Sequence, residues 1–117
     1  MAAPNIVNVT AIYGRTAVMA VTTTPTALIT NAANSNQVLK VDTLMIANVN
    51  GTSNASVTVD IFRSSVAYDI TYLMTVPAGA TIDALSKYVY LEEGDSLRLT
   101  ASANSFIEAV ASYEQIS

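Results

Sequence analysis

Apolar and polar residues alternate along most of this chain with a period of two. Between residues 57 and 61, Val57, Val59 and Ile61 fall on one side of an extended chain, and Thr58 and Asp60 fall on the other. Residues 96–101 repeat the pattern, with leucines and alanine alternating with polar side chains. A period of two with one apolar side predicts a β-strand whose sheet is covered on one face.

A third alternating segment covers residues 70–76. Here we expect Ile70, Tyr72, Met74 and Val76 to share the covered face, with the threonines on the other side.

Turn-forming residues divide the alternating pattern into short segments. The predicted strands are residues 6–13, 16–21, 27–30, 38–49, 56–63, 67–76, 81–85, 88–91, 96–101 and 107–113. The predicted breaks are Gly14-Arg15, Thr24-Pro25, Asn34-Ser35-Asn36, Asn50-Gly51, Ser64-Ser65, Pro77-Ala78-Gly79, Gly94-Asp95 and Asn104-Ser105. Short strands at this spacing predict an all-β fold, a single-domain antiparallel β-sandwich (jelly-roll-like) of about 8–10 strands. The domain spans residues 1–117, with residues 1–9 as a candidate N-terminal arm.

The segment 38–49 departs from simple alternation. Residues Leu44, Met45, Ile46 and Ala47 are apolar on both faces of the strand. Two interpretations fit: a central strand of the sheet, or a strand whose outer face is covered by another subunit.

Composition limits the chemistry that the chain can perform. It has no His, Cys or Trp, a net charge of −4, and 12% charged residues, about half of the usual share. Scattered basic residues on an acidic chain argue against binding to nucleic acid or to an anionic membrane. A surface with so few charges predicts an oligomer or a docked protein.

Catalytic groups are correspondingly few. A serine or threonine nucleophile needs a base, and the chain has neither His nor a Ser-x-x-Lys arrangement. The carboxylates of Asp42, Asp60, Asp69, Asp83 and Glu108 show no spacing that would pair them for acid–base catalysis. We therefore predict that the protein is not an enzyme and uses no cofactor.

The acidic cluster Glu92, Glu93 and Asp95 is the weak candidate for a metal site. Ca²⁺ takes several oxygen ligands from one loop, and Gly94 would allow a sharp turn. The cluster lacks the alternating ligand spacing of an EF-hand loop. The favoured interpretation is a turn between strands, with Gly94 at positive φ and Asp95 capping the turn, and no metal.

The tyrosines offer a candidate binding surface. Tyr88 and Tyr90 would share one face of their strand, where flat rings with polar tips suit a sugar or a protein partner. The alternative is ordinary packing within a sheet or at a subunit interface.

Several segments, taken in order, resemble small virion structural proteins of tailed bacteriophages, particularly of phages that infect cyanobacteria. These segments are residues 1–10, 27–33, 46–52, 76–80, 90–103 and 112–117. The resemblance implies a non-enzymatic capsid decoration (cement) protein that stabilises the head shell. It also implies binding to the major capsid protein and self-association, with a trimer as one form.

The resemblance carries a location as well. The protein would assemble in the host bacterial cytoplasm and end on the capsid surface of the virion. The N-terminus has neither the basic nor the apolar region of a Sec-type signal. Ile6 and Val7, in the candidate arm, are expected to bind a neighbouring subunit by adding a strand.

Two alternatives remain open from the sequence. The tyrosine pairs and the Asn- and Thr-rich loops also fit a tail, neck or fibre component, or a module that binds glycans on a host surface. The acidic cluster alone would fit a Ca²⁺-dependent carbohydrate-binding module.

Overall fold

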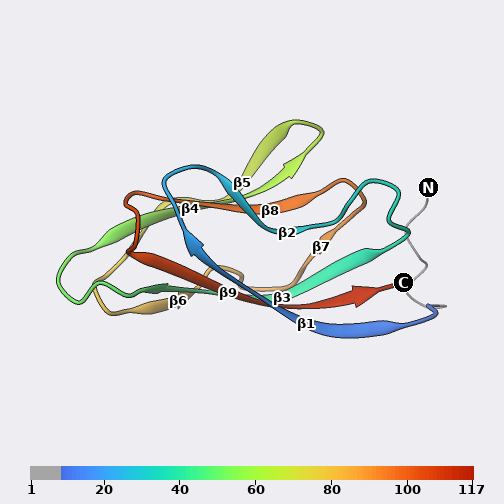
Figure 1. Cartoon of the computed structure of the whole chain (residues 1–117), viewed down its shortest axis with the longest axis horizontal. Helices are drawn as coiled ribbons and strands as arrows, with labels where there is room; N and C mark the ends of the chain where they lie inside the picture. The colour runs from blue at the N-terminus through green and yellow to red at the C-terminus, as the bar shows by residue number, and fades with distance from the viewer. Residues whose placement is uncertain (1–8) are drawn as a thin grey trace.

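The computed structural model describes residues 9–117, which form β-strands and turns (Figure 1). The strands are β1 (Ile12–Val21), β2 (Thr26–Thr30), β3 (Val38–Asn48), β4 (Ala55–Arg63), β5 (Val66–Val76), β6 (Thr81–Asp83), β7 (Val89–Leu91), β8 (Ser96–Ala101) and β9 (Ile107–Ile116). Within this part of the chain no helix is long and apolar enough to cross a membrane.

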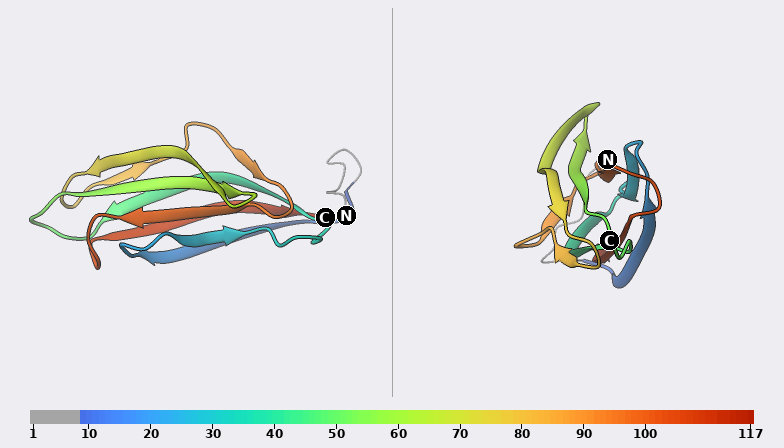
Figure 2. Two further views of the ribbon diagram at one scale, coloured as in Figure 1. Left: turned by 90° about the horizontal axis from the view of Figure 1, so that it is seen from above. Right: turned by 90° about the vertical axis from the view of Figure 1, so that its left-hand side faces the viewer.

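The strands form two antiparallel sheets that pack face to face, as the two views in Figure 2 show. One sheet, sheet A, has the order β1-β9-β3-β6, and β7 pairs with β3 beside β6. The other, sheet B, has the order β2-β8-β4-β5. Consecutive strands lie in opposite sheets with two exceptions: β4 and β5 form a hairpin in sheet B, and β6 and β7 both pair with β3 in sheet A. This is the topology of a jelly roll, so the predicted all-β sandwich is confirmed.

The core lies between the sheets and follows the predicted alternation. Val57 and Val59 of β4 and Leu97 and Leu99 of β8 are completely buried. Each such side chain contributes about 1.5–3 kcal/mol by leaving water. Leu44 and Ile46 of β3 fill the core from sheet A in the same way.

Strand β3 is central, as the first interpretation of residues 38–49 predicted. It pairs with β9 along one edge and with β6 and β7 along the other. Its double-sided apolar pattern has a simple origin, because Leu44 and Ile46 face the core whereas Met45 faces outward and stays 44% exposed.

The predicted break at Gly14-Arg15 is wrong. Strand β1 runs through both residues in unbroken register with β9, where Gly14 lies opposite Glu114 and Arg15 opposite Tyr113. The glycines with positive φ are Gly79 and Gly94, and Gly14 is not among them. Continuous pairing with β9 therefore keeps Gly14 extended.

The predicted face of Tyr72 is also wrong, because strand β5 contains bulges. Its register with β4 shifts between Val57 and Val59, so that Tyr72 and Leu73 together lie opposite Thr58. Leu73 has φ 49°, and its N–H donates to the Thr58 hydroxyl at 3.0 Å. The extra residue turns Tyr72 outward, where it is 71% exposed.

Candidate functional site

The acidic cluster forms a turn in which each carboxylate already has a protein partner. Asp95 is buried, and its two oxygens accept hydrogen bonds from Nε and Nη2 of Arg63 at 2.8 and 2.5 Å. Glu92 also accepts from Arg63, at 3.0 Å, and Glu93 accepts from the backbone N–H of Asn36 at 2.8 Å. Gly94 has φ 90°, which confirms the predicted turn.

The cap predicted for Asp95 is present as well. Its Oδ2 accepts a hydrogen bond from the backbone N–H of Glu92 at 2.8 Å. Burial alone would raise the pKa of Asp95, but the hydrogen bonds from Arg63 and Glu92 and the charge of Arg63 outweigh it and lower that pKa. The same ion pair raises the pKa of Arg63.

This arrangement gives Glu92, Glu93 and Asp95 a structural role within the turn. Among residues 9–117 no group of three potential metal ligands lies together.

One carboxylate pair arises from strand register, which spacing along the sequence did not predict. Asp60 on β4 lies opposite Asp69 on β5. The carboxylate of Asp60 is buried and accepts a hydrogen bond from Arg98 Nε at 2.9 Å. Since the Arg98 guanidinium also lies 4.0 Å from the centre of the Phe62 ring, these residues form a packed ion pair on the outer face of sheet B.

Tyr88 and Tyr90 lie together, but they do not form a flat platform. Their ring centres are 5.4 Å apart and the ring planes meet at 77°. The ammonium group of Lys40 lies 4.5 Å from the centre of the Tyr88 ring. The perpendicular rings and the lysine make this a small mixed cluster, suited to an edge contact with a protein better than to stacking under a sugar.

The other two predicted contact residues, Ile6 and Val7, lie outside the described residues. Their proposed role in a strand-adding arm stays a prediction.

An apolar row crosses the outer face of sheet A and was not predicted. Val18 on β1 lies directly opposite Val110 on β9, which in turn lies opposite Met45 on β3. Val18 is 72% exposed and Met45 is 44% exposed. Three adjacent strands thus present neighbouring apolar side chains to the outside.

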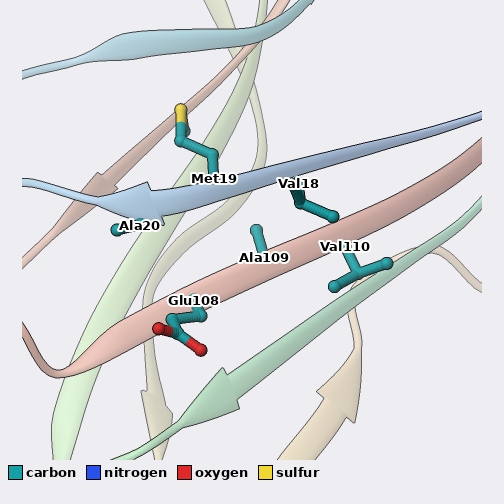
Figure 3. A pocket seen from close by; sticks show the side chains of 6 residues that line it. All are labelled: Val18, Met19, Ala20, Glu108, Ala109 and Val110. Atoms are coloured by element: carbon teal, nitrogen blue, oxygen red, sulfur yellow. The ribbon is translucent and has the colours of Figure 1, made fainter.

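A shallow hollow lies beside this row, where β1 and β9 run together (Figure 3). Its lining comes from residues 18–20 and 108–110. Figure 3 shows Met19 and Ala109 pointing to one side of the sheet and Glu108 and Val110 to the other. Glu108 is the ionisable group among these lining residues, so the hollow offers apolar contact and one charge.

The sequence carried a signal for this surface that is clear only in retrospect. Val110 alternates with Glu108 and Ser112, so it occupies a position that alternation assigns to the polar face of its strand. Val18 and Met45 lie in segments that are apolar on both faces, residues 17–21 and 44–47, so alternation assigns neither of them to a face. The three residues become informative when the register places them side by side.

Comparisons with known proteins identify the fold and no more. No protein-family profile matches the chain. No curated protein sequence matches it either. A solved structure of a protein from Bacillus endospore appendages, described as disulfide-linked pili, matches with a TM-score of 0.55 and 9% identity. The match covers 92% of this chain and 87% of the other. By fold, this chain is therefore similar to that appendage protein.

Proposed function

We propose that this protein is a non-enzymatic structural subunit of a tailed-phage virion that decorates the outside of the capsid. The observation that carries the proposal is the apolar row Val18–Val110–Met45, which lies on an open sheet face instead of in an enclosed cleft. A surface of this kind suits contact with another protein surface. The ordered resemblance of its segments to small virion proteins supports the location.

A decoration protein acts by mass action. Copies that bind the assembled shell, and not its separated subunits, stabilise the shell by the free energy of their binding. The major capsid protein would be one partner and further copies of this chain the other. Residues 1–9, with Ile6 and Val7, would add an arm that contacts a neighbour.

The fold likeness favours a second candidate, a subunit of an extracellular fibre. The similar Bacillus protein belongs to appendages described as disulfide-linked pili. This chain has no cysteine, so a fibre built from it would rely on non-covalent contacts.

Quantitative mass spectrometry of purified virus particles that carry this gene tests the proposal. We expect hundreds of copies per particle, on the scale of the major capsid protein. A handful of copies per particle would contradict a decoration role. Gold-labelled antibodies bound along filaments or tails, with bare heads, would favour the fibre candidate.

A further inference from the structure

Strand β1 forms one edge of sheet A. Among the described residues, no bulge or cluster of charges on it hinders pairing with another strand. The strand pairs with β9 over ten consecutive residues without a register shift, and Arg15 is its single charged residue. The other edges are all interrupted. Strand β5 carries two register shifts, β2 carries one, and β6 and β7 are three residues each. Long, regular edges with few charged residues readily pair with another strand.

The backbone of β1 has every second residue available for such pairing. Ala11 and Ser117 exchange both hydrogen bonds, at 3.0 Å and 2.9 Å. In an antiparallel ladder, such exchanging pairs alternate with pairs whose N–H and C=O groups point away. The even-numbered residues from Ile12 to Ala20 therefore point their backbone groups away from β9, towards the open edge.

Gly14 lies on this edge, and neither its backbone conformation nor its surroundings in the single chain require a glycine. It has no positive φ, and a Cβ atom built on it would meet nothing within 4 Å. Glycine in the interior of a strand is destabilising, and often marks a place where another chain comes close.

We propose that two copies of this chain pair through their β1 strands, antiparallel, about a two-fold axis at Thr16. In this register Thr16 lies opposite the partner copy's Thr16, and the whole of β1 is paired. Val18, the most exposed apolar residue on the strand, lies opposite the glycine of the other copy at position 14. The two five-stranded sheets become one continuous sheet.

Competing registers are less favourable. Moving the axis to Arg15 would place two arginines directly opposite each other, which destabilises a strand pair. Moving it to Ala17 pairs as many β1 residues but places Val18 opposite Thr16 instead of the glycine, and moving it beyond Ala17 shortens the paired length.

A second copy is favoured over an unrelated strand because the edge matches itself. The two-fold axis at Thr16 places the protruding Val18 beside a residue with no side chain on both sides at once. An interface of one strand from each copy lies below the roughly 1,200 Å² of standard interfaces, so the dimer should depend on concentration. The inference deepens, and rests on, the self-association in the proposed function, and it is independent of where the assembly is found.

Charge exchange at the axis tests the register. Thr16→Lys and Thr16→Glu should each raise the dimer dissociation constant at least tenfold in sedimentation equilibrium, since like charges then face each other. A mixture of the two variants should recover a species of twice the 12.3 kDa chain mass. Association that is unchanged in both variants would overturn the proposal, as would a mixture that stays monomeric.

Cross-linking provides a second measurement that does not depend on affinity. The chain has no cysteine, so Thr16→Cys introduces a single thiol. Mild oxidation should join two copies, because paired residues lie within disulfide range. Ser112→Cys is the matched control: it lies beside Thr16 on β9, yet in the dimer its two copies are about 14 Å apart across three strand spacings.

Equal cross-linking of the two variants would overturn the proposal. So would preferential cross-linking between Thr16→Cys and Val7→Cys chains, which would assign the edge to the N-terminal segment. Neither result bears on the virion location. Conversely, absence of the protein from capsids would leave the β1 dimer standing.

Discussion

Replacing Arg63 with methionine should destabilise the protein more than replacing its partner Asp95 with asparagine. The two side chains differ sharply in exposure, with 46% of Arg63 and 1% of Asp95 accessible. When Asp95 is changed, Arg63 can turn to water. When Arg63 is changed, the buried carboxylate keeps only its hydrogen bond from the Glu92 N–H.

The structure sets the size of the difference. Removing one partner of a buried pair costs about 3–5 kcal/mol when it leaves an uncompensated charge. The remaining bond from Glu92 places Arg63→Met at the lower end, about 3 kcal/mol at pH 7. Asp95→Asn loses charge-assisted hydrogen bonds and should cost about 1.5–2 kcal/mol. In the double variant at least ~1 kcal/mol of the summed cost should be recovered, because no buried charge is left.

The dependence on pH follows from the direction of the pKa shift. The folded pKa of Asp95 is lowered, so this group stabilises the protein above its unfolded pKa of about 3.9 and loses that effect as pH falls through the folded pKa. Without Arg63, burial dominates and raises the pKa of Asp95. Protonation of Asp95 at low pH then removes the unpaired buried charge. The loss of unfolding free energy caused by Arg63→Met should therefore be smaller at pH 3 than at pH 7.

Urea denaturation followed by circular dichroism at both pH values measures these costs. Arg15→Met is the control, because Arg15 bonds to the amide of Gln115 at 2.7 Å and should change stability by less than about 0.5 kcal/mol at either pH. An equal cost of Arg63→Met at pH 7 and pH 3 would refute the reasoning. So would a larger cost for Asp95→Asn.

Three further substitutions test other parts of the fold by the same urea assay. Leu73→Gly should stabilise the protein by about 1 kcal/mol by relieving φ 49°, and a loss would mean that Leu73 packs better than its exposure suggests. Asn48→Asp should cost at least ~2 kcal/mol, because the amide donates to the carbonyls of Ser53 and Val76 at 2.9 and 3.0 Å; a neutral effect would contradict this. Leu44→Ala should cost about 2–5 kcal/mol, and a cost below 1 would contradict its central place in the core.

The sheet faces were predictable from the sequence because alternation is a local property. Val57, Val59, Leu97 and Leu99 entered the core as expected. The failures occurred where pairing with a distant strand overrides the local pattern. Gly14 looks like a turn residue until β9 holds it in register, and Tyr72 looks inward-facing until a bulge against β4 turns it out.

The candidate surface was less accessible to prediction for the same reason. The acidic cluster could be recognised as a turn from four consecutive residues, but its cation, Arg63, is 32 residues away from Asp95. The apolar row depends on three strands whose order along the sheet is fixed by the topology. Residue types alone did not single out Val18 or Val110.

For contacts made through the surface of a β-sandwich, the order of the strands in each sheet matters more than the sequence of any one strand. Alternation predicts which side chains face the core, but it does not predict which strand lies at the edge of a sheet. The jelly-roll topology places β1 there, and this changes the meaning of its residues. A glycine that weakens an internal strand becomes room for a neighbour's Val18, and a stretch with one charge becomes an edge that is open to pairing. The scarcity of charge in this sequence therefore matters most along β1, where a single lysine at Thr16 should be enough to keep two copies apart.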